Sequence, residues 1–159
     1  MTELSLADGF AALNRGDLAT AGEACKQALA ANQKHVPAHF LVGLVALEGK
    51  QRQVAHEAFK SVVTLDRDHA AAWAHLAKLN VGEGRIAAAE SALREVRRIQ
   101  PSDPMVIELT GTVLNSLGEY EAAELFFERA HQMVPQSPSA LMNLGNVRVF
   151  LGKIDEAVA

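Results

Sequence analysis

Six histidines in a chain of 159 residues raise the question of a metal site, because imidazole is a common ligand of zinc. His35 and His39 lie four residues apart, the spacing at which two side chains share a helical face. Pro37 lies between them, however, and proline favours the first turn of a helix. His35 then belongs to the junction before the helix and His39 to the helix itself. We therefore expect no metal site at this pair.

Asp66, Asp68 and His69 form a second cluster of metal-binding residue types, again at an expected junction between helices. A polar junction exposed to solvent explains it as well as a metal does, and this is the interpretation that we favour. The single cysteine, Cys25, excludes a cysteine-rich zinc site and an internal disulfide, and it is typical of a reducing, cytoplasmic setting. We predict neither a metal nor another cofactor.

Catalytic constellations are equally hard to assemble from this sequence. It offers no Ser/His/Asp order, no glycine-rich phosphate loop after a strand, and no pair of carboxylates facing a cleft. Glu119, Glu121 and Glu124 lie near an expected helix start, where acidic side chains stabilise the positive end of the helix dipole. We predict that the chain has no catalytic residues and is not an enzyme.

The charge balance argues against nucleic acid and membrane partners. The net charge of −4 gives no long-range attraction for phosphate. Arg94, Arg97 and Arg98 form the one dense basic group, but Glu95 interrupts it and a helix end is the expected place for it. The longest apolar stretch, residues 36–47, is too short to span a bilayer, and residues 1–4 lack the features of a secretory signal. We expect a soluble, cytoplasmic protein.

The elements that carry these residues repeat every 34 positions. One column holds only alanine, a second holds glycine or alanine, and a third holds glycine in four blocks of five: Ala21, Ala55, Ala89, Ala123 and Ala157; Gly9, Gly43, Ala77, Gly111 and Gly145; Gly16, Gly84, Gly118 and Gly152. Lys50 breaks the third column, and we expect its neighbour Gly49 to supply the turn there. A fixed period with small residues is typical of a repeat architecture.

Each block predicts two antiparallel helices joined by a short turn. In residues 104–137, apolar residues recur at helical spacings of three, four and seven on both sides of the pair Gly118-Glu119. The small columns fit the close crossing of the two helices, and larger residues fill the remaining gaps: Trp73, Ile107 and Leu141 in one column, and Phe59, Leu93 and Phe127 in another. One hairpin cannot bury its apolar faces, so successive hairpins must stack.

These columns resemble the tetratricopeptide repeat. The third block matches the motif at Trp73, Leu76, Ala77, Gly84, Ala89, Val96 and Pro101, and the fourth at Gly111, Gly118, Tyr120, Ala123, Phe127, Ala130 and Pro135. The repeats are 2–35, 36–69, 70–103 and 104–137, with a partial fifth at 138–159, in one domain over residues 1–159. Asp8, Arg52, Gln33 and Arg67 depart from the motif, and Asp8 suits the polar outer face of a terminal repeat.

The resemblance implies an all-α fold, a right-handed α-α superhelix of antiparallel helix hairpins. It also implies a concave groove, lined by the first helix of each hairpin, that binds an extended peptide or a helix. The groove positions that we single out are Phe10, Phe40, Leu44, His75, Lys78, Glu108, Thr112, Asn115, Asn143 and Asn146. Some apolar groove positions, Leu13 and Leu47 above all, have packing against a neighbouring helix as an equally good explanation.

The function that we predict is a non-catalytic protein–protein interaction module whose ligand is a protein or a peptide. The alternative is the N-terminal repeat region of a longer bacterial enzyme, such as a sulfotransferase or a glycosyltransferase. A third interpretation is self-association, because the fifth hairpin has only a short second helix and leaves an apolar C-terminal edge for a homodimer.

Overall fold

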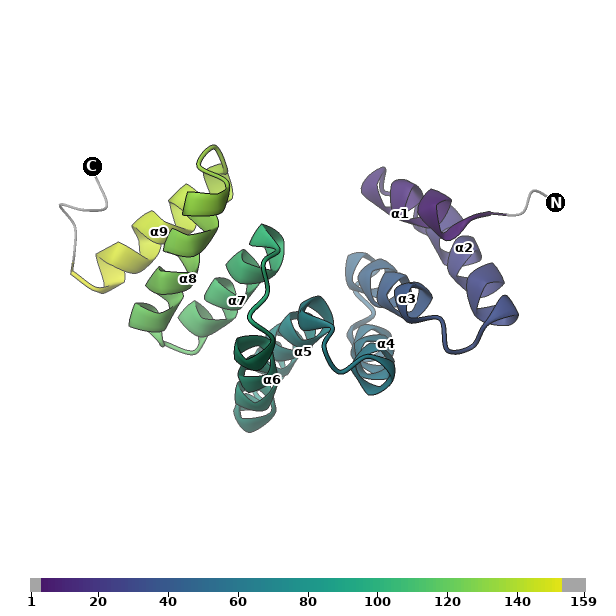
Figure 1. The fold of residues 1–159 in the computed structure, drawn as a ribbon, viewed down its shortest axis with the longest axis horizontal. Coiled ribbons are helices and arrows are strands. Elements are labelled where there is room, and N and C mark those ends of the chain that lie inside the picture. The colour runs from purple at the N-terminus through teal and green to yellow at the C-terminus, as the bar shows by residue number, and fades with distance from the viewer. Residues whose placement is uncertain (1–3, 153–159) are drawn as a thin grey trace. The chain divides into compact units, whose positions relative to one another are not determined.

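The computed structural model describes residues 4–152, which contain nine α-helices and no strand (Figure 1). The helices are α1 (Leu6–Asn14), α2 (Leu18–Ala31), α3 (Val36–Glu48), α4 (Arg52–Leu65), α5 (Ala70–Gly82), α6 (Ile86–Ile99), α7 (Pro104–Ser116), α8 (Tyr120–Met133) and α9 (Pro138–Phe150). The prediction of an all-α helical repeat fold is confirmed. The chain divides into two compact units, Met1–Ala72 and Trp73–Ala159, which are described separately. The predicted single domain and the count of repeats stay predictions.

The turns inside the hairpins end each first helix in the same way. After α1, Gly16 adopts a φ of 77° and its N–H donates to Leu13 O, while the N–H of Asp17 donates to Ala12 O. This pair of bonds is a Schellman motif, which satisfies the last carbonyls of the helix. Gly84 and Gly118 repeat it after α5 and α7. The glycine column therefore follows from a left-handed backbone at one position per repeat.

The expectation for the second turn was wrong. Lys50 itself takes the left-handed conformation, with a φ of 58°, whereas Gly49 has a φ of −76°. The N–H of Lys50 donates to Leu47 O and that of Gln51 to Ala46 O, so the hydrogen bonds match those of the other turns. The geometry of the repeat overrides the residue's own preference for a negative φ.

The junctions between hairpins begin the next helix with a capping side chain at a fixed position. His35 and His69 each use Nδ1 to accept the N–H of the residue three places on, at 3.3 Å and 3.2 Å. Asp103 and Ser137, at the equivalent positions, accept from Met105 and Ala140. The junction histidines are thus helix caps. Asp66 accepts the N–H of Asp68 in the turn that precedes His69.

The first helix has its own cap, which changes the interpretation of Asp8. The hydroxyl of Ser5 accepts the N–H of Asp8, and the Asp8 carboxylate accepts the N–H of Ser5, so the two residues form a capping box. The Ser5 hydroxyl also donates to the Asp8 carboxylate over 2.6 Å, and this bond, followed by the one from the Ser5 backbone, lowers the pKa of Asp8 below its usual value. Asp8, the third residue of α1, thus completes the cap at the start of the first helix.

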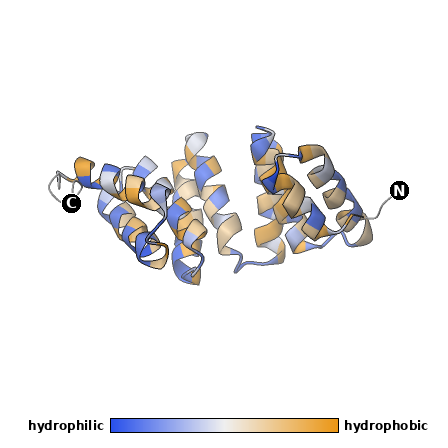
Figure 2. Ribbon diagram, turned by 90° about the horizontal axis from the view of Figure 1, so that it is seen from above, coloured by the Kyte–Doolittle hydropathy of each residue, from blue (hydrophilic) through white to orange (hydrophobic). Residues whose placement is uncertain are grey.

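The core of the first unit depends on close helix crossings. α1 packs on α2 and on α3, and α3 packs on α4. A Cβ at Gly9 would lie 2.8 Å from Ala24 Cβ, so only glycine fits this crossing. Ala21, Ala55 and Phe59 are fully buried. Figure 2 shows hydrophobic and hydrophilic residues interleaved along the helices.

The second unit repeats this packing in α7, α8 and α9, where Gly111 lies against the ring of Phe127. Ile107, Ala130 and Ala140 form one buried cluster, and Phe126 packs against it. Leu141 was expected to fill a gap in the column of Ile107. Instead it is 49% exposed on α9. The register of the column is right, but the described residues place no helix over this side of α9.

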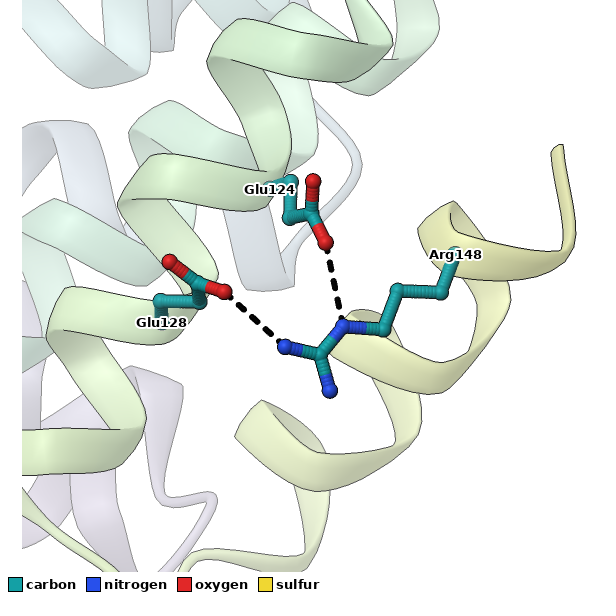
Figure 3. Close-up of polar contacts among 3 residues, drawn as sticks. All are labelled: Glu124, Glu128 and Arg148. Atoms are coloured by element: carbon teal, nitrogen blue, oxygen red, sulfur yellow. Dashed lines mark hydrogen bonds and ion pairs between the residues drawn. The ribbon is translucent and has the colours of Figure 1, made fainter. Parts of the chain in front are cut away.

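Arg148 on α9 forms a partly buried charge cluster with Glu124 and Glu128 on α8 (Figure 3). Its Nε lies 3.0 Å from Glu124 Oε1, and its second guanidinium nitrogen lies 2.9 Å from Glu128 Oε1. The hydrogen bond to Glu124 is the main cause that raises the pKa of Arg148. Glu124 is only 7% exposed, so its role is pairing with Arg148 across two helices, which corrects the expected helix-dipole role.

Candidate peptide-binding surfaces

In the first unit, the predicted groove residues lie on two helices that touch. Phe10 lies on α1, and Phe40 and Leu44 lie on α3. All three side chains are half-buried. The Phe40 ring lies 5.6 Å from the Phe59 ring and 4.6 Å from the His69 ring, measured between centroids. Phe40 therefore also holds the core of this unit together, which the sequence did not reveal.

Leu13 and Leu47, for which packing against a neighbour was an equal alternative, are half-buried as well. Leu47 lies in the last turn of α3, where its carbonyl accepts the N–H of Lys50. The side chains of Leu13 and Leu47 are thus partly covered and partly exposed to solvent, and the choice between packing and binding stays open.

In the second unit, a pocket of about 430 Å³ lies against α7. It is lined by Pro104, Met105, Glu108, Leu109, Thr112, Ala130, Val134, Ser137 and Ser139. Asp103 and Pro104 begin α7 by capping, and from there Met105, Glu108, Leu109 and Thr112 recur at helical spacing along one face. The end of α8 and the start of α9 provide the other wall.

Two predicted groove residues, Glu108 and Thr112, line this pocket, and a third lies next to it. Asn143 on α9 donates from Nδ2 to Glu108 Oε1 over 3.1 Å, which links the two first helices. The Thr112 hydroxyl donates to the carbonyl of Glu108 over 3.1 Å. The structure therefore brings Glu108, Thr112 and Asn143 into one place, although they come from two repeats.

The remaining predicted positions do not line this pocket. His75 and Lys78 lie on α5, with His75 half-buried and Lys78 exposed. Asn146 is exposed on α9. Asn115 is half-buried on α7, and its Oδ1 is buried without a hydrogen-bond partner among residues 4–152. A binding role for these four residues stays a prediction.

Sequence reasoning missed the apolar side of the pocket. Met105 is 80% exposed, and Val134 is 40% exposed where α8 ends. Met105 and Leu109 lie one turn apart next to Glu108, so helical spacing was a usable signal for them. Val134, Ser137 and Ser139 come from the junction between two repeats, for which the sequence offered no such signal.

A second hollow of about 440 Å³ lies over α4, lined by His39, Glu57, Lys60, Ser61, Thr64 and Leu65. Four of its polar side chains, those of His39, Glu57, Ser61 and Thr64, are hydrogen-bonded within the chain. The hydroxyls of Ser61 and Thr64 donate to carbonyls one turn back, and His39 Nε2 lies 2.8 Å from Gln33 O. We regard it as a solvated helix face.

Metal-binding groups and membrane-spanning helices are both absent from the described residues. Within residues 4–152, no group of three or more His, Cys, Asp or Glu side chains is arranged to hold a metal ion. No helix in the same range has both the length and the apolar character needed to cross a membrane.

Comparisons with known proteins agree on the repeat. The family model for the tetratricopeptide repeat matches residues 46–111. Anaphase-promoting complex subunit 7 of Arabidopsis thaliana is 24% identical over 96% of this chain, but the chain spans only 28% of that relative. The crystal structure of MamA superposes with a TM-score of 0.71 at 26% identity, covering 94% of this chain and 88% of MamA.

A thermophilic tetratricopeptide repeat protein of Thermus thermophilus superposes with a TM-score of 0.79. It is 22% identical over 96% of this chain and 84% of that protein, a likeness that shows the fold alone. The repeated caps and turns, the matched family model and these structures lead to one conclusion. Residues 46–111 of this chain match the tetratricopeptide repeat family, and the chain has the fold of a tetratricopeptide repeat protein.

Proposed function

We propose that this protein is a non-catalytic interaction module that binds a segment of a partner protein on the faces formed by its first helices. The observation that carries the proposal is the pocket on α7, where exposed Met105 and half-buried Leu109 lie beside Glu108 and Thr112. A mostly apolar hollow with a few oriented polar groups is the usual form of a recognition site. Phe10, Phe40 and Leu44 are the corresponding candidates in the first unit.

A peptide library tests this proposal on the full chain. Phage displaying random twelve-residue peptides are selected on the immobilised protein, and the enriched sequences are synthesised with capped ends. We expect Thr112→Phe to abolish their binding, measured by fluorescence polarisation, because the ring fills the pocket. The fold should tolerate the change, since the Thr112 hydroxyl bonds only to a carbonyl of its own helix.

Thr64→Phe is the matched control. Thr64 makes the same bond to a carbonyl one turn back, but it lies on α4 at the second hollow. Binding that survives Thr112→Phe, or a library that enriches no peptide, contradicts the proposal. Loss of binding in Thr64→Phe alone would place the site on α4 instead.

A second copy of the chain is another candidate partner, because α9 carries exposed apolar side chains. Leu141, Met142 and Val149 are 49%, 63% and 55% exposed. Phe150 stacks on Tyr120 with centroids 5.1 Å apart and is still 64% exposed. Exposed apolar patches of this kind promote association. Sedimentation velocity should show a dimer for the full chain and a monomer for Leu141→Glu/Val149→Glu, and a monomeric parent chain contradicts this homodimer.

The relatives reported above do not support the alternative of a repeat region attached to a sulfotransferase or a glycosyltransferase. The reading frame that follows residue 159 decides it. A strand, a phosphate-binding loop and a helix encoded there would revive the alternative.

A further inference from the structure

The charge of the α7 pocket suggests what kind of peptide it takes, an inference that rests on the function proposed above. Glu108 is the one charged side chain among the residues that line the pocket. The other lining groups are apolar side chains and three hydroxyls. A half-buried carboxylate next to apolar atoms is partly shielded from water. The electrostatic attraction between this carboxylate and a cation that binds beside it is therefore stronger than at an exposed site.

The Glu108 carboxylate is oriented and retains acceptor capacity. Asn143 Nδ2 donates to Oε1 over 3.1 Å, which fixes the carboxylate against α9. A carboxylate offers about four acceptor positions, and this bond uses one of them. Within residues 4–152, no ion pair joins Glu108 to a cation of the chain.

Several arginines of the second unit are bonded elsewhere, so they do not supply that cation. Arg97 pairs with Glu119, Arg98 with Glu95, and Arg148 with Glu124 and Glu128, while Arg129 donates to Pro101 O. Each of these bonds is 3.2 Å or shorter. A cation for Glu108 is therefore expected to come from the ligand.

The apolar wall determines what accompanies the cation. Met105, Leu109, Ala130 and Val134 provide it, and a methionine side chain adapts its shape to different partners. The alkyl stem of a lysine or an arginine packs well on such a wall while its charged end reaches a carboxylate. In an extended peptide, residues two apart point to the same side, so a second side chain enters together with the first.

We propose that the α7 pocket selects partner segments in which a lysine or an arginine and a large apolar residue lie two positions apart. The cation binds the carboxylate of Glu108, and the apolar side chain lies on Met105, Leu109 and Val134. Asn143 acts as a positioning residue that holds the carboxylate.

The same phage library tests this on the full chain. We expect the enriched twelve-residue peptides to share a basic residue two positions from Leu, Ile, Phe or Met. One peptide is then synthesised in two forms, with its basic residue intact or replaced by norleucine, which keeps a stem without the charge. The neutral form should bind the parent chain about three- to tenfold more weakly.

The two peptide forms are also measured against the variant Glu108→Gln. Glutamine keeps an oxygen that accepts the hydrogen bond from Asn143 but has no charge. We expect the two peptide forms to bind Glu108→Gln within a factor of two of each other. Glu90→Gln is the control, since Glu90 is exposed on α6 and its removal changes the net charge equally. That control should preserve the discrimination seen with the parent chain.

The outcomes separate this inference from the proposed function. Suppose that peptides are enriched and that Thr112→Phe blocks their binding. If the peptides then share no basic residue, or if Glu108→Gln still distinguishes the two peptide forms as the parent chain does, the cation site is overturned. The proposed interaction module stands in that case. If no peptide is enriched, both proposals fail. Unchanged thermal melting of Glu108→Gln makes a binding change attributable to the lost charge.

Discussion

The ring of Phe59 occupies the space that a side chain at Gly43 would need. A Cβ built on Gly43 would lie 2.5 Å from Phe59 Cε1 and 2.6 Å from Cζ. Phe59 is fully buried and also contacts the ring of Phe40, so it has little freedom to move away. The helices α3 and α4 can therefore approach each other this closely only because Gly43 has no Cβ.

We expect Gly43→Ala to lower the free energy of unfolding by about 1–3 kcal/mol, because the added methyl overpacks this crossing. Gly22→Ala on α2 is the matched control. Apart from the neighbouring backbone of α2 itself, no atom of the described residues lies within 4 Å of its Cβ position, so the substitution should raise stability by about 0.5–1 kcal/mol. Urea titration followed by circular dichroism measures both. Equal effects of the two substitutions would mean that the α3–α4 crossing is looser than described.

The cap at His69 predicts a dependence of stability on pH. Burial lowers the pKa of His69 below its ordinary value of 6.5, although the nearby Asp66 acts in the other direction. The folded state thus favours the neutral ring, whose Nδ1 accepts the N–H of Ala72. As pH falls below about 6.5, the unfolded chain takes up the proton first, and stability drops until the lowered pKa of the folded state is passed.

His69→Asn should make stability depend less on pH between 7 and 5, because asparagine also caps helices and does not titrate. Unfolding in urea at several pH values, compared with the parent chain, isolates this contribution from those of the other five histidines. Parallel pH profiles for the two proteins would show that His69 does not change protonation on folding.

The alanine column predicts a strong contrast on α6. Ala89 is fully buried, whereas Ala87 is exposed on the same helix. Ala89→Leu should cost about 1–3 kcal/mol by overpacking, while Ala87→Leu should stay within about 0.5 kcal/mol of the parent. Thermal melts of the two variants check the register directly. Similar losses in both would show that the register of α6 is wrong.

The pairing of Arg148 with Glu124 predicts an asymmetry between breaking the pair and replacing it. Arg148→Leu leaves the buried Glu124 carboxylate without this cation, and we expect a loss of about 1–3 kcal/mol. Arg148→Leu/Glu124→Leu should recover much of that loss, because Leu114 fills the equivalent position on α7 and is fully buried. Arg94→Leu is the exposed control. A double variant less stable than Arg148→Leu contradicts this account.

The sequence was sufficient for the features that recur every 34 residues. Helix starts, left-handed turns and small residues at crossings each depend on a single position, so their columns revealed the hairpins. The left-handed conformation of Lys50 was not predicted, because it is imposed by the hydrogen bonds of the turn and not by the residue type. The ion pair between Arg148 and Glu124 was not predicted either. It joins side chains from two different repeats, and a periodic pattern does not show which side chains meet across repeats.

The candidate site shows the same division. The resemblance to the tetratricopeptide repeat predicted Glu108 and Thr112 as groove residues, and both line the pocket. The contribution of Val134 and the hydrogen bond from Asn143 required the packing of α8 and α9. The partial burial of Phe40 against His69 required the cap at the start of α5. A pocket is formed where several helices pack together, whereas a sequence pattern describes only one helix at a time.

The positions of the caps bear on how such a chain changes length during evolution. Asp103 caps the start of α7 and Gly118 takes the left-handed conformation in the turn after it, so the signals for this pair of helices lie within a block of 34 consecutive residues that begins at Asp103. An in-frame duplication of that block copies every start and stop together and leaves no helix end without a partner. Length is therefore a variable that genetic duplication alters at little cost to folding, while binding preference changes separately through substitutions such as those at Glu108.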